Sequence, residues 1–123
     1  MKGIDKNNVK EIEKAIYITN QHIKERVESY IHFYSKPHEI AAKINKDTRL
    51  TLSYDYDSCE INCIEFIGLY SMHINSINMD DINFISIDYD DNNILESLSF
   101  YFKENVIISI EFSDREIFKP TIL

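Results

Sequence analysis

The sequence predicts an α+β domain: a long N-terminal amphipathic helix and a short second helix packed on a mostly antiparallel sheet of about five strands. Apolar residues recur every three or four positions in the first third of the chain, and they alternate with polar residues after position 49. Helices followed by strands are typical of this class. The 123 residues fit a single domain with a helical part at 1–47 and a β-sheet part at 48–123.

The first helix is expected over residues 9–34. Asn8 and Glu11 resemble a capping box, and Asn20 is the weakest position of the apolar stripe. Pro37 should end the helix near Ser35, because the residue before a proline avoids the α region. The following segment PHEIAAKIN predicts the second helix, with the proline in its first turn.

Five later segments have the composition of strands, and several alternate with period two. They are RLTLSYDY, CEINCIEFIGLYSMHI, INFISIDYD, ESLSFYF and VIISIEF. A change of phase between Phe84 and Ile85 indicates either a bulge or a strand buried on both faces. The short connection KEN between the last two segments predicts an antiparallel hairpin.

Charge is distributed unevenly along the chain, whose net charge is −8. Residues 1–49 sum to +3, whereas residues 50–102 contain ten acids and no lysine or arginine. Such an acidic half would repel a phosphate backbone, which argues against nucleic-acid binding.

Metal and catalytic motifs are incomplete. Asp88, Asp90 and Asn92 are spaced like the start of an EF-hand loop, but the glycine and the glutamate that such a loop requires are Asn93 and Ser99. Zinc ligation by Cys59, Cys63 and His73 lacks a second ligand pair, so the cysteines are better interpreted as core residues. The four histidines are scattered, and His38-Glu39 is better explained by helix first-turn chemistry than by acid–base catalysis. We therefore expect no enzymatic activity, no metal and no cofactor.

The N-terminal residues lack the apolar core of a signal peptide, and no apolar run is long enough to span a membrane. Cys59 and Cys63 would be too far apart on a strand for a disulfide, which favours reduced thiols and a cytoplasmic protein.

The acidic window is the remaining candidate site. Surface charge of one sign promotes solubility, but it also speeds encounter with a cationic partner. Tyrosines among the acids are typical interface anchors. The predicted partner-binding residues are Tyr54, Asp55, Tyr56, Asp57, Glu60, Asp80, Asp81, Asp88, Tyr89, Asp90 and Asp91, with the five aspartates at 80–91 forming one patch.

Isoleucine and asparagine are unusually frequent, which indicates AT-rich coding and a bacterial source. A small, acidic, bacterial α+β domain without a catalytic motif resembles the immunity proteins of contact-dependent growth inhibition and other polymorphic toxin systems. The resemblance rests on the overall layout and on the acidic window 50–102. It implies a monomer or weak homodimer that neutralises a cognate basic toxin, such as an RNase or DNase. Two alternatives stay open: an adaptor or regulatory protein that binds another basic protein, and a metal-dependent enzyme that uses the aspartates.

Overall fold

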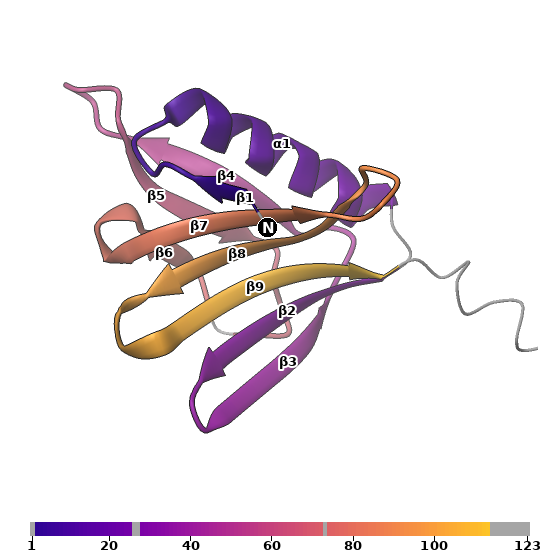
Figure 1. Ribbon diagram of the computed structural model, residues 1–123. Coiled ribbons are helices and arrows are strands. Elements are labelled where there is room, and N and C mark those ends of the chain that lie inside the picture. Colours follow the sequence, from indigo (N-terminus) through magenta and orange to yellow (C-terminus); the bar gives the residue numbers. More distant parts are fainter. Residues whose placement is uncertain (1, 26–27, 73, 114–123) are drawn as a thin grey trace, which may run out of the picture.

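The computed structural model describes residues 2–25, 28–72 and 74–113, which form one α-helix and nine strands in two antiparallel sheets (Figure 1). Two short 3-10 turns, η1 and η2, precede β7 and β9. The elements in chain order are β1 (Lys2–Ile4), α1 (Val9–Glu25), β2 (Glu28–Ser35), β3 (His38–Ile44), β4 (Arg49–Tyr54), β5 (Ile61–Ile67), β6 (Ser76–Asn78), η1 (Met79–Asp81), β7 (Ile82–Tyr89), β8 (Leu95–Phe102), η2 (Lys103–Asn105) and β9 (Val106–Ser113).

The larger sheet has six strands in the order β1-β7-β8-β9-β2-β3, so both ends of the described chain contribute to it. Near the centre of this sheet, apolar side chains alternate along each strand with serines, which are buried as well. Ile31 of β2, Ile110 of β9 and Leu98 of β8 lie side by side and are fully buried on one face of the sheet. The residue before and the residue after each of them point to the other face. Helix α1 and the smaller sheet, with strand order β4-β5-β6, pack on the apolar face, and Ile12, Ile23 and Ile64 complete one continuous core.

The predicted long helix is correct at its start and wrong at its end. Helix α1 begins at Val9, and the Glu11 amide donates to Asn8 Oδ1 at 3.1 Å, as a cap requires. It ends at Glu25. Residues 28–35 are strand β2, in which Ser29 and Ile31 are buried between partly exposed neighbours. That burial has period two, because the segment pairs with β9 along its whole length.

The predicted second helix is also wrong. The segment HEIAAKI is strand β3, paired with β2 through seven consecutive residues without a register shift. Lys36 and Pro37, joined by a cis peptide bond, form the turn between the two strands. The assignment of His38-Glu39 to a helix first turn fails with it. The fold is therefore mostly sheet, and the expected helical part at 1–47 supplies three of the six strands of the larger sheet.

The later strand segments are closer to expectation. Strands β4, β5, β7, β8 and β9 fall within the five predicted segments or within one residue of them, and β8 and β9 form the expected antiparallel hairpin. Strand β7 has a register shift, a bulge or irregularity, between Ile82 and Phe84, close to the predicted change of phase. Strands β1 and β6, each of three residues, were not predicted.

The contact between α1 and β4 depends on Asn20. Its side-chain Nδ2 donates to Leu50 O at 2.8 Å, and its Oδ1 accepts from Leu50 N at 2.7 Å. The amide group thus pairs with the edge of β4 as a neighbouring strand would. The position that looked weakest in the helix pattern is polar because it holds the helix to the smaller sheet.

We expect Asn20→Ala to lower the free energy of unfolding by about 2 kcal/mol, since both backbone groups of the buried Leu50 lose their partner. Urea unfolding measures this change. Gln21→Ala is the matched control, because this exposed neighbour bonds only the Tyr17 hydroxyl among the contacts described; its effect should stay within about 0.5 kcal/mol. Equal losses in the two variants would contradict the role of Asn20.

Candidate protein-binding site

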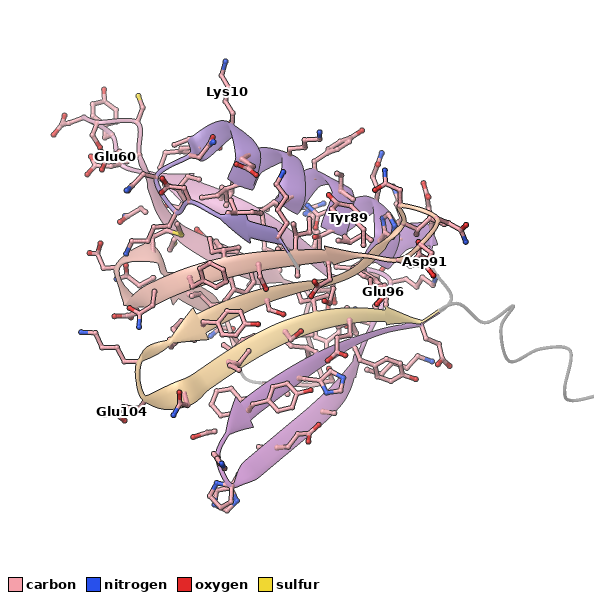
Figure 2. The ribbon with its side chains drawn as sticks, in the orientation of Figure 1. Lys10, Glu60, Tyr89, Asp91, Glu96 and Glu104 are labelled. Carbon is pink, nitrogen blue, oxygen red and sulfur yellow. The ribbon has the colours of Figure 1, made fainter. Side chains whose placement is uncertain are left out.

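The predicted acidic residues lie at two ends of the molecule. Asp80 and Asp81 precede β7, and Asp88, Asp90 and Asp91 lie at its other end. Asp81 and Asp88 are seven residues apart along extended chain, which separates the two groups by about 23 Å. Figure 2 shows Glu60 near one end of the molecule and Asp91 and Glu96 near the other. The five aspartates at 80–91 therefore do not form the single patch that the sequence suggested.

The first end is built from the loop between β4 and β5, residues 55–60, which projects beyond the body of the molecule (Figure 1). Its backbone is closed by bonds from Asp55 N to Glu60 O at 2.7 Å and from Cys59 N to Asp55 O at 3.0 Å. Asp55 Oδ1 also accepts from Asp57 N at 2.9 Å. All six residues are exposed. We call this segment the acidic loop.

Asp80 belongs to the same end. Together with Glu60 it lines a cavity of about 150 Å³ at the base of the acidic loop. Lys6 lies in the same cavity, and its Nζ donates to Ile82 O at 3.0 Å and to Met79 O at 3.5 Å. This lysine comes from the slightly basic N-terminal third of the chain, so the charge separation in space is smaller than the sequence suggested.

Asp81 faces a different environment. It lines a cavity of about 390 Å³ with Lys103, Glu104 and the apolar side chains of Phe33 and Phe102. It is thus separated from its sequence neighbour Asp80 by the turn of η1.

The second end is the turn between β7 and β8, and its acids have structural roles. Asp90 Oδ1 accepts from Asn92 N at 2.8 Å and from Ile94 N at 2.9 Å, which is the role that an aspartate has in many turns. Asp88 Oδ2 accepts from Ser97 Oγ at 3.3 Å. Asp91 is exposed. The EF-hand-like spacing is therefore explained by the turn.

The three predicted tyrosine anchors have different surroundings. Tyr54 donates to Glu13 Oε2 at 2.5 Å and thereby links β4 to α1. Tyr89 lines a cavity with Lys2 and Lys14. Tyr56, at 97% exposure, is the most exposed large hydrophobic residue described and stands in the acidic loop.

The cysteines do not both occupy the core, as the sequence had suggested. Cys59 is exposed in the acidic loop with a φ of 60°, and Cys63 is half-buried in β5; both are free thiols. His73 lies outside the described residues. In residues 2–25, 28–72 and 74–113 no group of three histidine, cysteine or acidic side chains is arranged to hold a metal ion.

A second polar cluster, which the sequence analysis missed, lies on strands β2, β3 and β9. His32 is placed between two carboxylates, with Nε2 at 3.2 Å from Glu111 Oε2 and Nδ1 at 3.5 Å from Glu39 Oε1, and its ring stacks on Tyr34. Burial, followed by the charges of Glu111 and Glu39, raises the pKa of Tyr34. A strand assignment for ESYIHFYS would have revealed this cluster from the sequence, because alternate residues of a strand share a face and Tyr30, His32 and Tyr34 are alternate residues.

Comparison with family models, with curated protein sequences and with solved structures found no match. No helix in the described part of the chain has the length and apolar character that a membrane crossing requires. The functional argument therefore rests on the geometry of the chain itself.

We expect Tyr54 to titrate late, because the bond to Glu13, then burial and the Glu13 charge, raise its pKa from 10.0 to about 12. A raised folded-state pKa stabilises the fold at pH values below 10, and this contribution is lost as the pH rises from about 10 toward 12. NMR of ring-labelled tyrosine measures the titration. Tyr54→Phe assigns the signal, and Glu13→Gln should lower the midpoint. A Tyr54 midpoint near 10 would contradict the bond.

Proposed function

We propose that this protein binds a basic protein partner through the acidic loop and neutralises it, as an immunity protein neutralises a toxin of the polymorphic class. The observation that carries the proposal is Tyr56, which is exposed in a loop that also holds Asp55, Asp57 and Glu60. A large apolar side chain exposed to water among carboxylates is typical of an interface anchor.

Preorganisation of the acidic loop supports this role. The backbone bonds that close the loop at Asp55 and the Asp57-to-Asp55 turn fix its shape before a partner arrives. A rigid loop loses less conformational entropy on association than a flexible one, so more of the contact energy is available for affinity.

The distribution of charge also favours the acidic-loop end of the molecule as the binding surface. Glu60 of the loop and Asp80 line the same cavity as Lys6, whose ammonium group contacts two backbone carbonyl oxygens of η1 and β7. A partner with clustered lysines and arginines would gain in association rate from such a surface. At the other end Asp90 accepts hydrogen bonds from its own turn and Asp88 accepts one from Ser97 of β8, so we assign them a smaller share.

A toxin with RNase or DNase activity suits this surface, because the carboxylates would take the place of substrate phosphates. An immunity protein of this kind acts in the cytoplasm, and the free thiols Cys59 and Cys63 suit a reducing compartment. An adaptor for another basic protein would use the same surface, and the activity of the captured partner separates the two functions.

The test compares two charge reversals of equal size. Asp57→Lys/Glu60→Lys changes the acidic loop, and Asp91→Lys/Glu96→Lys makes the same change of net charge at the far end. In affinity capture from cells that carry the gene, the loop variant should lose a basic protein that the wild type and the control retain. The purified partner should associate about tenfold more slowly with the loop variant at low salt, and the wild type should inhibit its activity at equimolar ratio.

Tyr56→Ala should speed dissociation of the complex and weaken affinity roughly thirtyfold, as loss of an interface anchor does. Surface plasmon resonance measures both rates.

Equal effects of the two charge reversals on association would show that the net charge of the protein matters and the position of the charge does not. An unchanged affinity of the Tyr56 variant would remove the anchor from the proposal.

A further inference from the structure

Strand β3 is a sheet edge that is open over most of its length. It ends the six-stranded sheet, and six of its seven residues are at least partly exposed. Other edge strands of the described chain are short or closed: β1 and β6 have three residues each, and Asn20 bonds the edge of β4. An exposed, unbulged edge of this length offers unpaired amide groups to another strand.

The sequence of β3 is complementary to itself. In an antiparallel pair of two copies with the two-fold axis at Ala41, Glu39 of each copy lies opposite Lys43 of the other. On the other face, Ile40 lies opposite Ala42 of the second copy. Opposite charges placed directly across a strand pair stabilise the pair. The Glu39–Lys43 pair occurs twice because of the two-fold symmetry.

The surroundings of these side chains fit this arrangement. Ile40 is 57% exposed beside Phe33, its neighbour on β2, and a second copy would cover it. Within one copy, Glu39 Oε1 lies 3.5 Å from His32 Nδ1, and Lys43 Nζ lies 3.7 Å from Glu28 Oε1. In the dimer, each of these contacts would continue into a Glu39–Lys43 pair with the second copy.

One contact bears on the backbone at the end of the edge. The carbonyl oxygen of Lys43 accepts from Ser71 Oγ at 2.7 Å, so this group faces away from β2. A carbonyl oxygen has two lone pairs and accepts a second bond from an added strand. We propose that β3 is a self-association edge, through which two copies of this chain form an antiparallel dimer with Glu39 paired to Lys43.

The first test uses charge reversal and sedimentation velocity between roughly 1 µM and 1 mM of the full chain. The wild type should form a dimer within this range. Glu39→Lys alone, and Lys43→Glu alone, should each weaken self-association roughly tenfold, since each places like charges across the axis twice. An equimolar mixture of the two variants should dimerise again, because both cross-axis pairs are then opposite in charge.

Circular dichroism of each variant checks that the fold is retained. A wild type that is monomeric throughout, or a mixture no more associated than its components, would overturn the proposal. A monomeric wild type would mean that β3 pairs with a different partner or with none. Neither result tests the proposed role of the acidic loop.

The second test reads the register directly in a Cys59→Ser/Cys63→Ser background. Ala41→Cys should form a disulfide-linked dimer on mild oxidation, because paired residues on the axis lie about 4.5–5.5 Å apart. Glu39→Cys is the matched control. Its two copies would lie four residues apart along the strands, about 13 Å, which is beyond disulfide reach. Equal cross-linking of the two variants, or none at position 41, would refute the proposed register.

Discussion

The pair of hydrogen bonds between the Asn20 side chain and the backbone of Leu50 joins the two halves of the structure. On one side lies the helix, which packs on the six-stranded sheet; on the other lies β4, the edge of the smaller sheet. The bond from Tyr54 to Glu13 joins the same two elements about two turns nearer to the start of the helix. Together they fix the position from which the acidic loop projects.

The strands of the second half could be predicted because their residues strongly favour one structure. Leu50 and Leu52 alternate with polar neighbours, and VIISIEF is β-branched and aromatic through most of its length. The helix start was likewise predictable from Asn8 and Glu11, which are local signals.

Strands β2 and β3 were not predictable from local signals. In residues 28–35, isoleucine and tyrosine fit a helical stripe as well as an alternating one, and pairing with β9, far along the chain, decides between them. Segment HEIAAKI consists largely of good helix formers, yet it becomes a strand because β2 offers it a complete ladder. The acids and tyrosines of the candidate site could be named from the sequence, but their division between two ends of the molecule follows from the position of β7 and could not.

The strand order has a consequence for how the chain reaches its native state. In the part of the chain that the structure describes, β1 pairs with β7 alone and β2 lies between β3 and β9, so the larger sheet is complete only when residues 106–113 are available. Contacts between such distant segments carry a large loop-closure entropy, and proteins dominated by them fold in milliseconds to seconds. During synthesis, the β2 edge of the β2–β3 hairpin therefore stays uncovered, as the β3 edge does, until residues 106–113 have left the ribosome.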